Sequence, residues 1–225
     1  DVITVSSPRM QFVFNKKSGL VTSYKVNGTE YFAEGFGIQP NFWRAPTDND
    51  YGNGEPKREQ IWKQSSKNFN VADVTTESDG NKTVLTANYL LAAGNLYIMK
   101  YTIYPDGVVH TDITFTSTDM KAADTEVSEA TLMATFTPGQ DAQRLASSKL
   151  NVPRIGVRFR LPSDMNQVEY FGRGPGENYI DRNASSFVDL YRTTADQMYV
   201  NNYVRPQENG HRTDTRWVEL SRKGG

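Results

Sequence analysis

Apolar and polar residues alternate with a period of two along much of the chain, a pattern that predicts β-strands. The clearest case runs from Asn95 to Ser117. One face of its first strand carries Tyr97, Met99, Tyr101 and Ile103. After a turn at Pro105, Asp106 and Gly107, one face of the returning strand carries Val109, Thr111, Ile113 and Phe115. We expect an antiparallel hairpin with one face against the core.

Further short runs rich in Val, Thr, Tyr and Phe predict more strands. A meander is expected from Met10 to Phe32, with turns at Asn15–Gly19 and Asn27–Gly28. Other runs lie at 81–91, 129–139, 154–162, 167–174, 185–193 and 215–220. Helical patterns are few: Pro56–Gln64 predicts one or two turns, and Gly176–Arg182 predicts one turn. The sum predicts an all-β protein, a large sandwich of antiparallel strands that forms one domain over residues 1–225.

Composition narrows the classes of partner and of chemistry. The formal net charge is -1, from 25 basic and 26 acidic side chains spread along the chain, so we expect neither nucleic acid nor a membrane as a partner. No apolar run approaches the roughly 20 residues that span a bilayer. The chain has no cysteine and only the histidines His110 and His211, about a hundred residues apart, so we expect no metal site and no cofactor in this chain. The compartment stays open.

The stretch NFWRAPTDNDYGNG, from Asn41 to Gly54, shows no period and is dense in aromatic, charged, proline and glycine residues. Rigid polar loops of this kind often carry function. The alternative is a structural loop in which Phe42 and Trp43 pack inward.

A second motif, from Glu169 to Ser186, contains Gly172, Gly174 and Gly176 directly after a predicted strand. Its spacing is G-x-G-x-G without a lysine, whereas phosphate-binding loops need G-x-G-x-x-G or G-K-[ST]. We therefore do not expect a nucleotide site.

A third motif, YVRPQENGHRTDTRW from Tyr203 to Trp217, gathers charged and amide side chains between aromatic residues. Such residues suit a sugar, whose hydroxyls need polar partners and whose CH face needs an aromatic ring. They equally suit an ion-pair network that fixes loops, with Arg212 or Arg173 on Glu208 or Asp181. Carboxylate pairs for glycoside hydrolysis include Glu177 with Glu208 and Asp48 with Asp50, but a chain with 26 acids always offers pairs, so none is selected.

Together the three motifs resemble one known domain. NFWRAPTDNDYG, YFGRGPGENYIDR and YVRPQENGHRTDTRW occur in the order found in the carboxyl-terminal β-sandwich domain (small chain, domain 5) of the LacZ-type β-galactosidases, glycoside hydrolase family 2. The resemblance covers about Asp1 to Leu220. It implies a large antiparallel β-supersandwich, similar to the galactose mutarotase fold, beside a catalytic TIM barrel. The catalytic glutamates of that family lie on the barrel, so the resemblance implies no catalytic residue here.

The resemblance also implies where the motif residues act. They would wall the substrate cleft or form the interface with the barrel, and Asn41 to Gly54 would face that barrel. The residues concerned are Trp43, Arg44, Asp48, Asn49, Asp50, Arg173, Glu177, Asn178, Tyr179, Glu208, Asn209 and Arg212.

We accordingly expect a domain fragment, truncated at its carboxyl end and lacking the barrel, that is inactive alone. Its implied partners are the barrel and other domains of the same polypeptide, the galactoside substrate, and further copies of the full enzyme in a homo-oligomer. Divalent or monovalent cations, if the parent enzyme uses them, would belong to the barrel. The competing hypothesis is an independent carbohydrate-binding or aldose 1-epimerase-like protein with the same fold.

Overall fold

The computed structural model describes residues 1–91, 95–116 and 152–224, which fall into two compact units. Unit 1 comprises Asp1–Arg44 and Arg58–Leu161, and unit 2 comprises Ala45–Lys57 and Pro162–Gly225. The strand expected over 129–139 lies outside the described residues. A single domain over residues 1–225 stays a prediction. None of the helices in the described ranges is long and apolar enough to cross a membrane.

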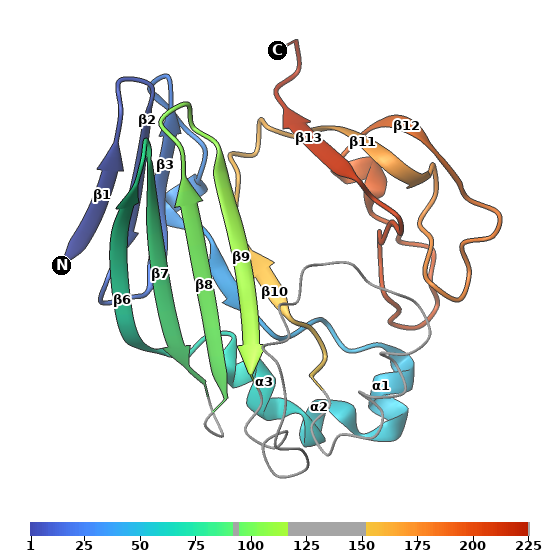
Figure 1. Ribbon diagram of the computed structural model, residues 1–225. Coiled ribbons are helices and arrows are strands. Elements are labelled where there is room, and N and C mark those ends of the chain that lie inside the picture. The colour runs from blue at the N-terminus through green and yellow to red at the C-terminus, as the bar shows by residue number, and fades with distance from the viewer. Residues whose placement is uncertain (92–94, 117–151, 225) are drawn as a thin grey trace. The chain divides into compact units, whose positions relative to one another are not determined.

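Unit 1 is built on two antiparallel sheets, each with its strands in chain order (Figure 1). The first contains β1 (Val2–Ser6), β2 (Met10–Asn15), β3 (Leu20–Val26) and β4 (Thr29–Glu30). The second contains β6 (Asn70–Asp79), β7 (Lys82–Leu90), β8 (Leu96–Ile103) and β9 (Val109–Thr116). A further antiparallel pair joins β5 (Gln39–Asn41) to β10 (Gly156–Arg158). The predicted meander and hairpin are confirmed as β2–β3–β4 and β8–β9, and the all-β antiparallel class is confirmed with them.

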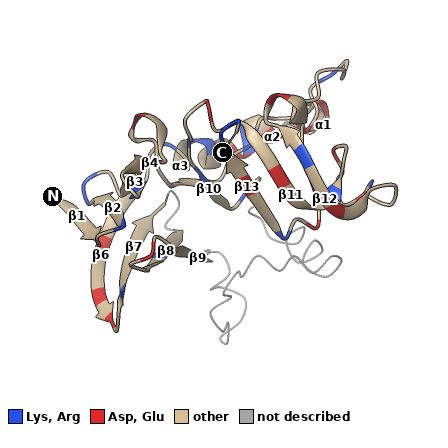
Figure 2. Cartoon of the chain, turned by 90° about the horizontal axis from the view of Figure 1, so that it is seen from above, with Lys and Arg blue, Asp and Glu red and all other residues tan. Residues whose placement is uncertain are grey.

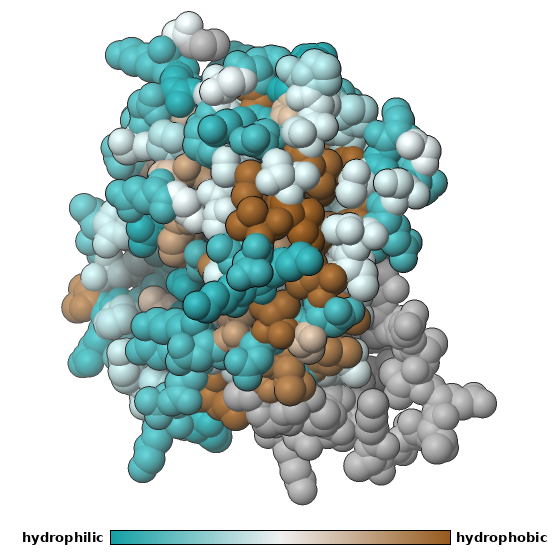
Figure 3. Space-filling model, turned by 90° about the vertical axis from the view of Figure 1, so that its left-hand side faces the viewer, coloured by the Kyte–Doolittle hydropathy of each residue, from teal (hydrophilic) through white to brown (hydrophobic). Residues whose placement is uncertain are grey.

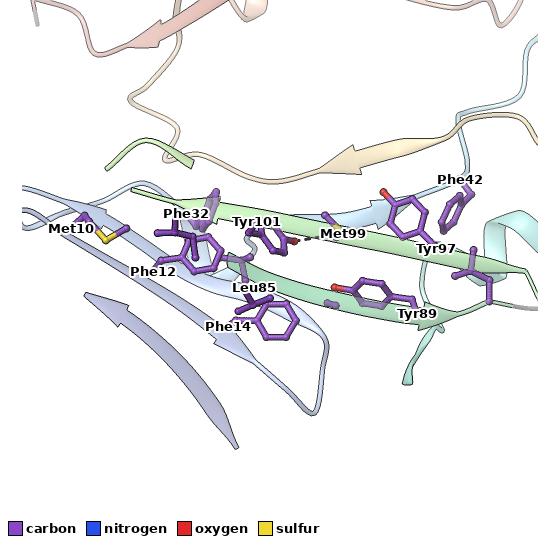
Figure 4. Close-up of a cluster of buried hydrophobic side chains, with 14 of the residues drawn as sticks. Met10, Phe12, Phe14, Phe32, Phe42, Leu85, Tyr89, Tyr97, Met99 and Tyr101 are labelled. Atoms are coloured by element: carbon purple, nitrogen blue, oxygen red, sulfur yellow. Dashed lines mark hydrogen bonds between the residues drawn. The ribbon is translucent and has the colours of Figure 1, made fainter. Parts of the chain in front are cut away.

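The core of unit 1 lies between these sheets, as the side chains in Figure 4 show. The alternation of apolar and polar residues predicts which side chains form this core, and Tyr97, Met99 and Tyr101 are indeed fully buried. The rings of Phe12 on β2 and Tyr101 on β8 approach to 5.4 Å between centroids, which joins the two sheets. Tyr97 keeps its hydroxyl satisfied by donating to the carbonyl of Gly156 at 3.0 Å, and burial raises the pKa of this tyrosine.

Strands β1 and β6 form an edge of each sheet, since each pairs with one neighbour. Figure 3 views the molecule from the side on which these strands lie in Figure 1, and apolar side chains gather there between hydrophilic ones. The partly buried hydrophobic residues of these two strands are Ile3, Val5, Val71 and Val74. Both strands lie outside the runs that we listed as predicted strands, and β6 carries mostly exposed polar residues.

The helices are short, as expected. Pro56–Gln64 was expected to form one or two turns, and the structure has α2 (Glu55–Arg58) and α3 (Gln60–Ser65) there. Trp62 on α3 is buried in the unit 1 core against Phe42, with ring centroids 5.9 Å apart. A turn of 3₁₀-helix, η1 (Ala33–Gly35), lies between β4 and β5.

Unit 2 contains the antiparallel sheet β12–β11–β13, formed by β11 (Gln167–Gly174), β12 (Phe187–Thr194) and β13 (Trp217–Ser221). It also contains helix α1 (Asp48–Asn53) and the 3₁₀ turn η4 (Asp196–Met198). Glycine is needed at Gly174, because a Cβ there would lie 2.8 Å from the ring of Tyr191. Figure 2 shows acidic and basic residues interspersed along the described strands of both units.

The predicted helical turn at Gly176–Arg182 is wrong. The segment forms a tight turn closed by an isolated antiparallel bridge between Tyr179 and Arg182. The backbone amide of Asn178 donates to the carbonyl of His211, and its side-chain amide donates to the carbonyl of Gly176. These bonds to partners outside a helix satisfy the polar groups that a helical turn would use, so the helix loses its advantage.

Candidate functional site

The second and third motifs lie together in unit 2, in what we call the loop cluster: residues 175–186 and 200–216. Asn178 is its centre and is fully buried. Its amide nitrogen donates to the carbonyls of Arg173 and Gly176, both at 3.1 Å. Its amide oxygen accepts from the backbone amide of Thr213 at 2.9 Å and from the Thr213 hydroxyl at 2.6 Å. One side chain thereby uses its whole hydrogen-bonding capacity: its amide nitrogen fixes the turn of the second motif, and its amide oxygen joins that motif to the third.

Glu177 holds the next layer of the cluster together, and its side chain is only 9% exposed. One carboxylate oxygen accepts from Arg182 at 2.8 Å and from the hydroxyl of Tyr203. The other accepts from the backbone amide of Gly210 at 2.9 Å and from the hydroxyl of Tyr179 at 3.3 Å. A nearly buried carboxylate that accepts from a cationic and a neutral donor on one oxygen, and from two neutral donors on the other, is a bracing group.

Aromatic and cationic groups stack beside this carboxylate. The rings of Tyr179 and His211 are 5.3 Å apart and nearly parallel, at 18°. The Arg182 guanidinium lies 4.7 Å from the Tyr179 ring. Nδ1 of His211 lies 3.0 Å from the carbonyl oxygen of Asn178, so Nδ1 carries the proton and donates it. Burial first, and the charge of Glu177 second, raise the pKa of the Tyr179 hydroxyl.

Two arginines bind the ends of the loops. Arg173 pairs through Nε with Asp214 and donates through Nη1 to the carbonyl of Ser186 at 2.6 Å. Arg212 donates to the carbonyls of Gly210 at 2.9 Å and Pro175 at 3.0 Å. The acid that Arg173 pairs with is thus Asp214, which differs from the acids expected from the sequence. Arg212 bonds two main-chain carbonyls and, through Nε at 3.4 Å, the hydroxyl of Tyr170. Although the partners differ, these bonds fix the loops, which is the role that the sequence offers as the alternative to a sugar site.

Asn209 closes the 200–209 loop on itself. Its amide oxygen accepts from the backbone amide of Val200 at 2.9 Å, and its amide nitrogen donates to the carbonyl of the same residue. Gly210 follows with φ of 73°, and a Cβ there would lie 2.9 Å from the carbonyl oxygen of Met198. Glu208, in the same loop, is partly buried.

The first motif divides between the two units. Ala45 to Gly54 belong to unit 2, where the side chain of Thr47 caps helix α1 and Asp50 accepts from the Thr47 amide at 2.6 Å in a capping box. The amide of Asp48 donates to the carbonyl of Pro206 at 2.7 Å, and its carboxylate lies 3.6 Å from Arg205. These contacts join α1 to the loop cluster. Asn49 is exposed on α1.

Trp43 and Arg44 lie in unit 1. Phe42 beside them is fully buried, with its ring 5.0 Å from that of Tyr97, so its inward packing is as the structural interpretation of this loop expected. Trp43 is partly buried, and the Lys63 ammonium lies 6.0 Å from its ring. The structure thus brings Asp48, Asn49, Asp50 and the second and third motifs into unit 2, without Trp43 and Arg44.

Sequence reasoning missed Tyr203 and Arg182 as members of the site. Arg182 donates to Glu177 and, at 2.6 Å, to the Tyr203 hydroxyl, which completes a triangle of charge-assisted bonds. Both residues stand inside the quoted motifs, but nothing in the sequence pairs positions 177 and 203. The placement of the motif residues in a substrate cleft or a domain interface stays a prediction.

The chemistry open to this site is limited by its bonds. Among the described residues, no group of three or more His, Asp or Glu side chains could hold a metal ion. The carboxylate of Glu177 is engaged at both oxygens, and Asp50 is buried in a helix cap. Both carboxylates are thereby held by donors of the protein itself. The site can present rigid loops to a partner.

Comparison with known proteins gives a consistent answer. The family model described as β-galactosidase small chain matches residues 6–225. The β-galactosidase of Priestia megaterium is 31% identical over 227 residues, covering 99% of this chain and 19% of that protein. That of Kluyveromyces lactis is 29% identical over 232 residues, with the same coverage. The β-galactosidase small subunit of Latilactobacillus sakei is 27% identical over 222 residues, covering 97% of this chain and 65% of the subunit. The chain thus spans about a fifth of the length of the first two relatives.

Proposed function

The chain belongs to the β-galactosidase small-chain family, and on that premise we propose that it is a non-catalytic part of a larger β-galactosidase. The complete enzyme would hydrolyse terminal non-reducing β-D-galactosides. In that enzyme this chain completes the architecture and shapes a wall of the active-site cleft, while the reacting carboxylates come from the rest of the protein.

The observation that carries the proposal is the use made of the motif side chains. Asn178, Glu177 and Arg212 direct their polar atoms at main-chain groups or at other side chains of the loop cluster. A sugar site needs polar atoms left available for hydroxyls. Side chains that hydrogen-bond within the loops keep these loops in one conformation. Such rigid loops favour a surface that binds a partner without rearranging.

The tips of these braced loops support a docking role. Ile180 is 58% exposed and Val204 is 99% exposed, and Tyr199, which directly precedes the second loop, is 68% exposed. Exposed aromatic and aliphatic side chains on a rigid base are typical of the central contacts of protein interfaces. We propose that these tips contact the remainder of the enzyme.

The proposal is tested on the isolated chain and on the complete enzyme in parallel. We expect the chain alone to give no heat with galactose, lactose or glucose in isothermal titration and no hydrolysis of nitrophenyl β-galactoside. Sugar binding by the chain alone in the millimolar range or tighter, or mutarotation of galactose, would instead identify an independent sugar-binding or epimerase-like protein.

A matched pair of variants in the complete enzyme tests the bracing role. Glu177→Gln replaces one accepting carboxylate oxygen with an NH2 group, which then faces the hydrogen-bond donors around that position. Asp181→Asn is the control, because it changes an exposed acid in the same loop. We expect Glu177→Gln to lower kcat/KM by about tenfold or more, which is about 1.4 kcal/mol, and Asp181→Asn to leave it within about twofold. Equal values for the two variants would remove the bracing role of Glu177.

A further inference from the structure

Unit 1 contains a pocket of about 250 Å³ between its sheets, and none of its lining residues belongs to the three motifs. Strands β2, β3 and β9 and the segments around Tyr31, Ile38 and Phe159 form its walls. Its lining is aromatic and aliphatic: Phe12, Tyr24, Tyr31, Phe32, Ile38, Val109, Thr111, Phe159 and Leu161. Phe159 is 47% exposed, so the pocket reaches the surface of the unit.

The wall beside Tyr31 is held in place by the side chain of Glu30. Its carboxylate accepts from the backbone amides of Tyr24 and Phe32, both at 3.0 Å, and from the hydroxyl of Ser23. Burial opposes ionisation, but these bonds and the charge of Lys25 outweigh it and lower the pKa of Glu30. A wall fixed by ionic hydrogen bonds resists collapse into the pocket.

A second set of bonds holds the remaining walls. The Tyr24 hydroxyl donates to the carbonyl of Gly107 in the β8–β9 turn, which ties β3 to that hairpin. The amide of Ala33 donates to the carbonyl of Arg160 at 2.9 Å, and the amide of Arg160 donates to the carbonyl of Phe36 at 3.0 Å. The pocket is therefore a preformed feature of the unit.

The lining decides what can fill this space. A stable buried water needs about two to four polar partners, and here Thr111 and the tyrosine hydroxyls are the polar side-chain groups of the lining. The Tyr24 hydroxyl is already bonded. A sugar would leave its hydroxyls unpaired in such a place. A cavity of about 150 Å³ suffices for benzene, so 250 Å³ accepts a ring or a large aliphatic group.

We propose that a large apolar side chain from the remainder of the β-galactosidase inserts into this pocket and anchors the small chain to it. The inference rests on the proposed function. Relatives such as that of Priestia megaterium contain about five times the length of this chain, so a covering segment is available in an enzyme of that kind. Exposed Phe159, with its ring 5.9 Å from that of Phe32, gives the rim the apolar character of an interface.

The test uses cysteine reactivity, because the chain contains no cysteine of its own. Thr111→Cys puts a thiol in the pocket wall, and Asp112→Cys puts one at the next, exposed position of β9, on the opposite face of the strand. The rate of labelling by a maleimide is followed at each site by peptide mass spectrometry, in the isolated chain and in the complete enzyme. We expect labelling of Cys at position 111 to slow by about tenfold or more in the complete enzyme, with position 112 unchanged.

Each other outcome has a defined meaning. Equal reactivity of position 111 in chain and enzyme overturns the anchor, even if the enzyme hydrolyses nitrophenyl galactoside and the proposed function stands. Protection of both positions also overturns it, because a general covering of β9 is then sufficient. A chain that labels slowly at position 111 when isolated has its pocket closed from within, which equally contradicts the inference. If the complete protein without either substitution did not hydrolyse nitrophenyl galactoside, that result would contradict the proposed function instead.

Discussion

Replacement of the buried Asn178 tests whether the loop cluster depends on one side chain. In Asn178→Ala the carbonyls of Arg173 and Gly176 lose their donors, and the amide and hydroxyl of Thr213 lose their acceptor. Each bond contributes about 1 kcal/mol net, so four lost bonds correspond to about 4 kcal/mol. Gly176 is exposed, and water can replace part of that loss. We expect a loss of about 2–4 kcal/mol in the free energy of unfolding.

Urea unfolding followed by tryptophan fluorescence and far-ultraviolet circular dichroism measures this loss. Asn202→Ala is the matched control, because Asn202 is exposed in the same unit, and it should change stability by less than about 0.5 kcal/mol. A loss below about 1 kcal/mol for Asn178→Ala would refute the central position of this residue.

Asn178→Asp separates the donors of the amide from its acceptor. A carboxylate keeps the bonds from Thr213 but places negative charge against the carbonyls of Arg173 and Gly176. Burial and these carbonyls would raise the pKa of the new acid in the folded state above its unfolded value. Its ionisation therefore destabilises the fold as the pH rises. We expect the deficit relative to the native chain to be smaller at about pH 4 than at about pH 7, and a deficit that does not depend on pH would contradict the geometry.

Other predictions concern single features of the two units. Thr47→Ala removes the N-cap of α1 and should cost about 1 kcal/mol in urea unfolding, and an unchanged midpoint would argue against the capping box with Asp50. Gly37→Ala would place a Cβ 2.7 Å from the carbonyl carbon of Val21, and we expect a thermal midpoint lowered by several degrees or no soluble protein. Glu30 has a lowered pKa, so it stabilises unit 1 above the ordinary glutamate range and stops doing so as the pH falls through its folded-state pKa. Glu30→Gln should accordingly unfold at lower urea than the native chain at about pH 7, and the difference should shrink at about pH 3.5.

The sheets could be predicted where one face of a strand is apolar and the other is polar. Strand β8 is such a case, because Tyr97, Met99 and Tyr101 are all buried. Strand β6 gives no such pattern, since Val71 and Val74 are its only partly buried residues within a mostly exposed strand. An edge strand of this kind is formed by pairing with its neighbour, which its own residues do not report.

Helix α1 is absent from the sequence interpretation for a similar reason. Its only buried residue is Asp50, so no apolar stripe marks it. The signal that could have found it is the capping box itself, Thr47 with an acid three residues on. Conversely, Gly176–Arg182 has helix-compatible residues and yet forms a turn, because Asn178 finds its partners in a loop distant in sequence.

The members of the candidate site were found through their motifs, whereas their partners were not. Glu177 meets Tyr203 across 26 residues, and Arg173 meets Asp214 across 41. Those pairings depend on how the connection from β11 to β12 packs against the connection from β12 to β13. No periodic pattern in the sequence predicts which residues of two such loops meet. Sequence alone offered many acids for each arginine, and geometry selects among them.

The most direct test of the proposed role is complementation of galactosidase activity in trans. A deletion variant of the β-galactosidase that lacks the segment corresponding to this chain is prepared. Its hydrolysis of nitrophenyl β-galactoside is measured before and after the purified chain is added. We expect activity below about 1% of the complete enzyme without the chain, and recovery that saturates as the chain is added. Full activity in the absence of the chain, or hydrolysis by the chain alone, would contradict an accessory part that completes the enzyme.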